Sequence, residues 1–191
     1  RWVKVDEFPN VNGYSLTPAV AISGDVAVVG IVYQVLGFNQ GIGGAYVYER
    51  DHKSGRWKRA QVLAPDPDEG IDGEDKFGWS VDVDADQEEP LVVVGAHGEN
   101  DKVGSVHVFR RTRSPRRTLS LRSAHWSRVG KVLPDFCPQG DFESNFGYSV
   151  AVSGNVIAAS ADCDFIVQLS TFNGTLNGIE SFQNVRYIDF K

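Results

Sequence analysis

The residues best suited to chemistry in this sequence are acidic. Asp82, Asp84, Asp86 and Glu88 recur at every second position, and oxygen ligands at alternate positions of a tight loop can surround a hard cation such as Ca²⁺. The alternative is a solvated acidic turn. Asp82 also aligns with strand positions elsewhere in the chain, which would direct its side chain into a sheet rather than toward a cation.

A second acidic cluster precedes Phe77 and could attract cations or basic partners, or simply keep a loop hydrated. Its members are Asp66, Asp68, Asp72, Glu74 and Asp75. The four histidines are scattered and form no metal-binding pair, and neither a nucleophile elbow nor a P-loop is present. His107 takes the place of an alternating strand residue, where we expect a satisfied structural histidine. We therefore predict no enzymatic activity, and Ca²⁺ is the one candidate cofactor.

The composition favours a folded all-β protein. The chain has 191 residues, of which 41% are hydrophobic and 23% charged, as in globular domains. Its 20 glycines and 8 prolines separate short apolar runs, which is typical of strands joined by turns. The net charge of −6 disfavours nucleic acid and anionic membrane as partners. No apolar run approaches the roughly 18 residues of a membrane helix, so we expect no membrane span.

The cysteines and the first residue bear on the origin of the chain. Cys137 and Cys163 lack metal-ligand spacing and are either a disulfide of a secreted protein or two unpaired thiols. The chain starts at Arg1, contains no Met and shows no leader sequence, so we interpret it as a processed piece or a fragment. Asn173 begins a glycosylation triplet, which matters only if the chain is secreted.

An internal repeat organises the sequence. Alternating apolar segments recur at 19–30, 80–95 and 149–160, and similar segments begin at Trp2, Trp57 and Trp126. The separation from Trp57 to Trp126 equals that from Phe77 to Phe146. A fixed offset shared by independent marks indicates a structural repeat.

Each repeat offers about four short strands of period two, which is the pattern of a propeller blade. We predict an all-β fold, an incomplete β-propeller of about three four-stranded antiparallel blades. The expected units are the tail of a preceding blade at 1–11, a blade at 12–65, a blade at 66–134 and a partial or degenerate blade at 135–191. An Arg-rich insertion at 110–124 is either a solvated loop or a basic handle for an anionic partner. Further blades of a longer parent chain, or identical chains, would complete the ring.

The repeat resembles the FG-GAP family, the propeller repeat of integrin α-chain heads and of many bacterial and eukaryotic surface proteins. The resemblance covers about residues 1–163 and is closest to the microbial and protist branch. It rests on Phe77-Gly78 and Phe146-Gly147, each followed by a strand, and on the turn Gly95-Ala96. It implies that both phenylalanines pack between blades, that the glycines permit close backbone approach, and that the three tryptophans cover outer strands.

The resemblance also implies a function and a site. In that family, the loop holding Asp82, Asp84 and Asp86 can bind Ca²⁺, although Gln87 and Pro90 replace an expected glycine and acid. It implies a non-catalytic binding or adhesion module, extracellular or at a cell surface, with a protein or glycan ligand. The ligand loops would be 31–43, 64–76, 96–103 and 134–145. Two alternatives stay open: an accessory propeller of a larger secreted hydrolase or lyase, and an intracellular scaffold of the WD-repeat kind.

Overall fold

A computed structural model shows the chain as strands joined by turns. It describes residues 19–32, 35–36, 39–40, 43–66, 74–86, 88–112, 125–135, 143–162, 166–176 and 179–189. Within these ranges the one helical element is a single short turn, α1, at Glu99–Lys102. The prediction of an all-β fold is therefore confirmed.

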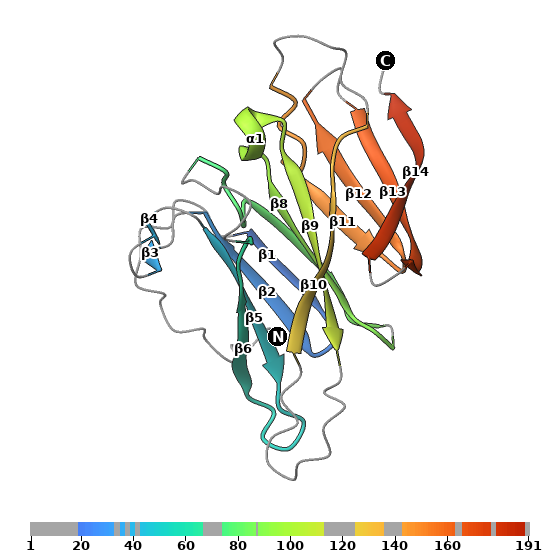
Figure 1. Ribbon diagram of the computed structural model, residues 1–191. Helices are drawn as coiled ribbons and strands as arrows, with labels where there is room; N and C mark the ends of the chain where they lie inside the picture. The colour runs from blue at the N-terminus through green and yellow to red at the C-terminus, as the bar shows by residue number, and fades with distance from the viewer. Residues whose placement is uncertain are drawn as a thin grey trace, which may run out of the picture.

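Three antiparallel sheets of four strands follow one another along the chain (Figure 1). The first blade has the order β1-β2-β5-β6, with bounds Ala19–Ser23, Val26–Ile31, Gly44–Arg50 and Trp57–Leu63. The second has the order β7-β8-β9-β10, with bounds Ser80–Asp84, Leu91–Ala96, Ser105–Thr112 and His125–Val132. The third has the order β11-β12-β13-β14, with bounds Val150–Ser153, Val156–Ala161, Ile166–Leu176 and Ile179–Asp189. The prediction of an incomplete propeller of about three blades is thus confirmed.

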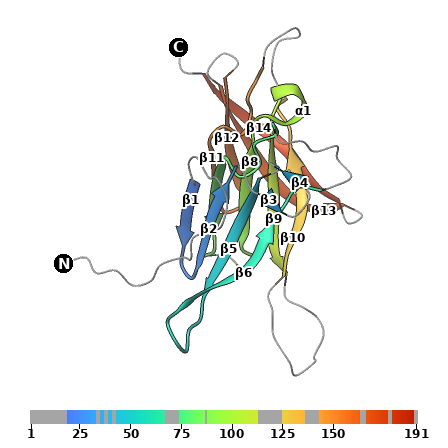
Figure 2. The ribbon, with the colours of Figure 1, turned by 90° about the vertical axis from the view of Figure 1, so that its left-hand side faces the viewer.

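In each blade the four strands lie side by side in chain order. In Figure 2 the strands of the first blade lie next to one another in the order β1, β2, β5, β6. A separate two-stranded hairpin, β3 (Val35–Leu36) with β4 (Asn39–Gln40), interrupts the connection from β2 to β5. The first hairpin of the blade turns at Gly24, whose φ of 53° suits the tight turn between the paired residues Ser23 and Val26.

Apolar cores fill the spaces between the blades. Valines of β2 and β5 in the first blade pack against the second blade, in a core that includes Phe77, Phe109 and Trp126. The other face of the second blade packs against the third, around Phe146 and Ile157. All of β8 is buried, because its successive residues enter the two cores alternately. This double burial explains why β8 reads as an uninterrupted apolar run.

The Phe-Gly pairs form the junctions between blades. Phe77 and Phe146 are fully buried, and each forms a parallel bridge with a glycine of the preceding blade, Gly43 and Gly104 respectively. Gly78 has a φ of 89°, and a Cβ there would lie 2.4 Å from the carbonyl oxygen of Gly44. The chain therefore needs glycine after the phenylalanine, both for backbone conformation and for the approach of the two blades.

The third blade is complete in topology although its sequence lacks the Gly-led and Trp-led marks of the other two. Strands β13 and β14, 11 residues each, take the third and fourth places in its sheet. Residues 1–11 and Trp2 lie outside the described residues. In the part of the chain that the structure describes, no helix is both long and apolar enough to cross a membrane.

Candidate functional site

The loop end of the second and third blades brings three aromatic rings together, one of them exposed. We define this loop end by residues 74–79, 96–104 and 143–149, which precede β7, connect β8 to β9 and precede β11. The middle segment forms α1, in which Asn100 and Asp101 have positive φ, so it is a tight turn rather than a regular helix. The turn is fixed to the third blade, because the backbone N–H of Asn145 donates to the carbonyl of Lys102 at 2.9 Å.

Three rings from two blades form what we call the aromatic trio: Trp79, His97 and Tyr148. Their centroids are 4.7 Å apart for Trp79 and His97, 5.1 Å for Trp79 and Tyr148, and 5.2 Å for His97 and Tyr148. Trp79 and Tyr148 each follow a Phe-Gly pair, so the two junctions place them side by side. Tyr148 is 47% exposed, whereas Trp79 and His97 are half-buried. In the trio, Tyr148 is therefore the ring exposed to solvent, and it packs against the rings of Trp79 and His97.

The imidazole of His97 is held by a polar chain. Its Nδ1 lies 3.4 Å from Oδ1 of Asn145, and Nδ2 of Asn145 donates to Oδ2 of Asp162 at 3.0 Å. Burial lowers the pKa of His97, so the ring is neutral near pH 7. The neutral ring can donate from Nδ1 to Oδ1 of Asn145, and the buried Nε2 has no hydrogen-bond partner among the described residues.

A buried carboxylate underlies the same turn. Glu99 accepts a hydrogen bond from Nε2 of His107 at 2.9 Å, and Ser105 and Lys131 also donate to it. Burial alone would raise the pKa of Glu99, but these donors lower it to about 2. Burial lowers the pKa of His107, which is fully buried and stacks edge-on against Phe77 at 5.1 Å. Glu99 therefore ties the turn to β9 and β10, beneath the surface.

The aspartates of β7 accept hydrogen bonds from the backbone of the third blade. Ser80, Asp82 and Asp84 line the face of β7 that meets the third blade. Oδ2 of Asp82 accepts from the backbone N–H of Val152, and Oδ2 of Asp84 from that of Gly154, both at 2.7 Å. These two carboxylates are thus engaged by the neighbouring backbone. Among the described residues, no three His, Cys, Asp or Glu side chains are grouped to hold a metal, and Ca²⁺ binding stays a prediction.

The described residues of the second acidic cluster have different surroundings. Asp66 is exposed and lies 3.9 Å from the guanidinium of Arg128, and Glu74 pairs with Lys76 at 2.9 Å. Asp75 is buried, and its carbonyl accepts from the N–H of Gly98 at 3.1 Å. Asp68 and Asp72 lie outside the described residues, as do Cys137, Cys163 and most of the Arg-rich insertion. Asn173 lies in β13.

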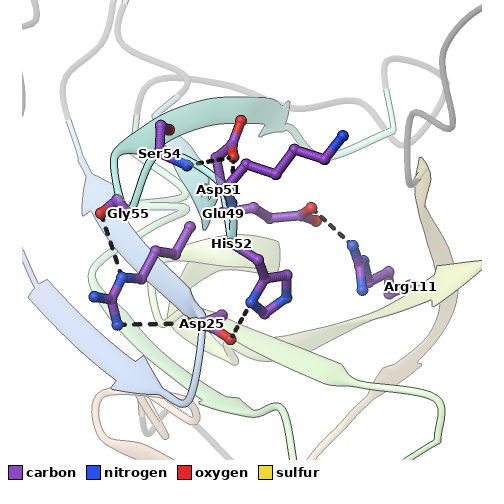
Figure 3. Close-up of polar contacts among 9 residues, drawn as sticks. Asp25, Glu49, Asp51, His52, Ser54, Gly55 and Arg111 are labelled. Atoms are coloured by element: carbon purple, nitrogen blue, oxygen red, sulfur yellow. Dashed lines mark hydrogen bonds and ion pairs between the residues drawn. The ribbon is translucent and has the colours of Figure 1, made fainter.

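The opposite end of the first two blades is joined by a polar cluster (Figure 3). Glu49 of β5 accepts from Arg111 of β9 at 2.8 Å and from the indole of Trp126 at 3.1 Å. Nearby, Asp25 lies 3.5 Å from Nδ1 of His52 on the β5–β6 turn. Trp126 is buried at the start of the outermost strand β10, and Trp57 starts the outermost strand β6. The contacts of Glu49 therefore tie β5 of the first blade to β9 and β10 of the second.

Sequence reasoning missed Glu99, Lys131 and the aromatic trio. One signal for Glu99 was available: His107 interrupts an apolar strand pattern, and a buried imidazole requires a polar partner. The trio could have been found from the aromatic residue that follows each Phe-Gly pair. No sequence pattern indicated that His97 would lie between those two rings.

Comparison with known protein families matches residues 58–109 to the FG-GAP repeat. The match runs from β6 through β7 and β8 to β9, and so it spans the first junction and most of the second blade. No curated protein matches the chain. The matched segment contains Phe77-Gly78 and Gly95-Ala96, on which the resemblance rested. Residues 58–109 are therefore similar to the FG-GAP repeat, and the three four-stranded sheets are the blades of an incomplete β-propeller.

Proposed function

We propose that this chain is a non-catalytic binding module that acts outside the cell or at its surface and contacts a protein or glycan through the loop end. The observation that carries the proposal is the aromatic trio, in which two adjacent blades present Tyr148 to solvent on a support of Trp79 and His97. Tyrosine and tryptophan are enriched at binding surfaces, because they offer large contact area with few rotatable bonds.

Rigidity beneath the trio supports a binding role. The turn that follows His97 is anchored by the buried carboxylate of Glu99 and by backbone hydrogen bonds to the third blade. A surface fixed in this way loses little conformational freedom when a ligand binds. Charged groups of both signs surround it, including the pairs Lys76 with Glu74 and Lys102 with Glu143. Such a rim can select a polar partner without providing the nucleophile or base of an enzyme.

The test is a biosensor screen of the folded chain against extracellular-matrix proteins and immobilised glycans, followed by two matched variants. Tyr148→Ala removes the exposed ring of the trio, and we expect it to weaken the binding found by about 10- to 100-fold. His52→Ala removes an exposed ring at the opposite end and should leave binding unchanged. Circular dichroism verifies that both variants fold. No binding across the panel, or binding lost in His52→Ala but kept in Tyr148→Ala, would overturn the proposal.

A further inference from the structure

The hairpin of β13 and β14 is longer than the sheet to which it belongs. Each of its strands has 11 residues, whereas β12 has 6. The pairing of β12 with β13 ends where Val156, the first residue of β12, meets Thr171. Among the described residues, positions 172–176 of β13 therefore pair with β14 alone. We call the two-stranded part at 172–176 and 179–182 the ribbon.

The ribbon contains a bulge. Its register shifts between Phe172 and Thr175, so that Asn173 and Gly174 lie opposite the single residue Ser181. A bulge leaves its extra residue outside the regular ladder and bends the strand. Asn173 therefore lies in an irregular segment of two paired strands rather than at a regular position in a four-stranded sheet.

The bulge coincides with the glycosylation triplet. Asn173-Gly174-Thr175 is the only Asn-x-Ser/Thr triplet in the 191 residues. In secreted proteins this triplet is the acceptor for an N-linked glycan, which is bulky and belongs at a surface. A triplet in a central strand such as β8, whose residues are all buried, would leave the glycan no room. Here the triplet falls where the sheet has narrowed to two strands.

The ribbon lies at the end of the third blade opposite the loop end. β13 begins beside the loop end, because Ile166 pairs with Ala161, and the next residue, Asp162, bonds to Asn145. From there β13 runs away from α1, and β14 returns toward it (Figure 1). A glycan on the ribbon would therefore leave the aromatic trio accessible to a ligand.

We propose that Asn173 accepts an N-linked glycan when the chain is secreted, because its triplet lies at the bulge of a ribbon that extends beyond the third sheet. This inference rests on the extracellular location in the proposed function. The carboxamide nitrogen of Asn173 forms a bond to the anomeric carbon of a lipid-linked oligosaccharide diphosphate. The bond from that carbon to the diphosphate breaks, the lipid diphosphate leaves with the electron pair, and the nitrogen loses one proton to a base of the transferase.

The experiment expresses the chain behind a cleavable secretion leader in eukaryotic cells and measures the mass of the secreted protein. We expect the mass to rise by one oligosaccharide per chain and to lose this increment on treatment with a peptide N-glycosidase. Asn173→Gln and Thr175→Ala should both abolish the increment, whereas Thr175→Ser keeps the hydroxyl of the triplet and should retain it. Thr171→Ala is the matched control, because it removes a hydroxyl of the same strand outside the triplet.

Two further measurements test the position of the glycan. Circular dichroism verifies folding, and glycan removal should shift the melting temperature by no more than about 4 °C if the sugar lies outside the packed sheet. Binding through the loop end, measured on the same samples, should not change when the glycan is removed. A folded, secreted chain without the added mass would overturn the inference, as would a glycan that persists in Asn173→Gln or a larger melting shift. Absence of any ligand with the glycan in place would instead contradict the proposed function.

Discussion

The bond between Asp84 and the third blade gives a quantitative prediction. Its Oδ2 accepts from the N–H of Gly154 at 2.7 Å, and hydrogen bonds to a charged group contribute about 1.5–3 kcal/mol each. Asp84→Ala leaves that N–H without its acceptor, so we expect the free energy of unfolding to fall by about 2–3 kcal/mol. In a chain of this size each kcal/mol lowers the melting temperature by about 2–4 °C, which predicts a fall of about 5–10 °C. Asp84→Asn keeps a neutral acceptor and should lose about half as much.

The measurement is thermal unfolding followed by circular dichroism, with excess Ca²⁺ and with chelator. Asp86→Ala is the matched control, because Asp86 is an exposed acid of the same loop and its removal should cost no more than about 0.5 kcal/mol. A metal loop would respond differently, since both aspartates would be ligands. If Ca²⁺ raises the melting temperature and both variants abolish that rise, or if Asp84→Ala melts like the parent chain, the reasoning from the blade interface is refuted.

Three further predictions concern the junctions and the buried carboxylate. The pKa of Glu99 is about 2 in the folded chain and about 4.5 when unfolded, so its carboxylate stabilises the fold above about pH 4.5, and this stability is lost as pH falls through about 2. In Glu99→Gln, the free energy of unfolding from urea titrations should depend less on pH between these values than in the parent. Gly78→Ala should destabilise by several kcal/mol, whereas Gly55→Ala, also at positive φ but with its nearest neighbour 4.0 Å away, should cost about 1 kcal/mol in the same titration. Phe77→Ala should cost about 3–5 kcal/mol, against less than about 1 kcal/mol for the half-exposed Tyr148→Ala; equal losses for the two would contradict the assignment of Phe77 to the interface core.

Much of the fold could be predicted from local pattern. Alternation of apolar residues identifies strands because side chains in a strand point to opposite faces, and Val81 and Val83 follow that rule. The Phe-Gly pairs mark the junctions because a fully buried ring and a close backbone approach both restrict the residue type. The third blade was harder to predict, since backbone pairing requires only two strands of matching length and no particular marker residue.

The candidate site was less accessible, because it depends on contacts between residues far apart in the chain. Acidic residues at alternate positions suggested a cation, yet Asp82 and Asp84 have backbone N–H groups of the next blade as partners. Alternation along a strand shows which face of the sheet a side chain lies on, but not which groups of the next blade lie opposite that face. In the same way, the sequence shows that His107 needs a partner, but only the folded turn shows that the partner is Glu99.

The bonds across the second interface have a consequence for the history of the repeat. Ser80, Asp82 and Asp84 all bond to main-chain atoms of the third blade, and the glycines of the junctions approach main-chain carbonyls. Every polypeptide offers those atoms, whatever its side chains. A blade copied by gene duplication could therefore dock at once on its neighbour, before any compensating substitution arose. The receiving backbone of the third blade keeps these bonds whatever side chains it carries, so units as dissimilar as the second and third blades can dock on each other in one molecule.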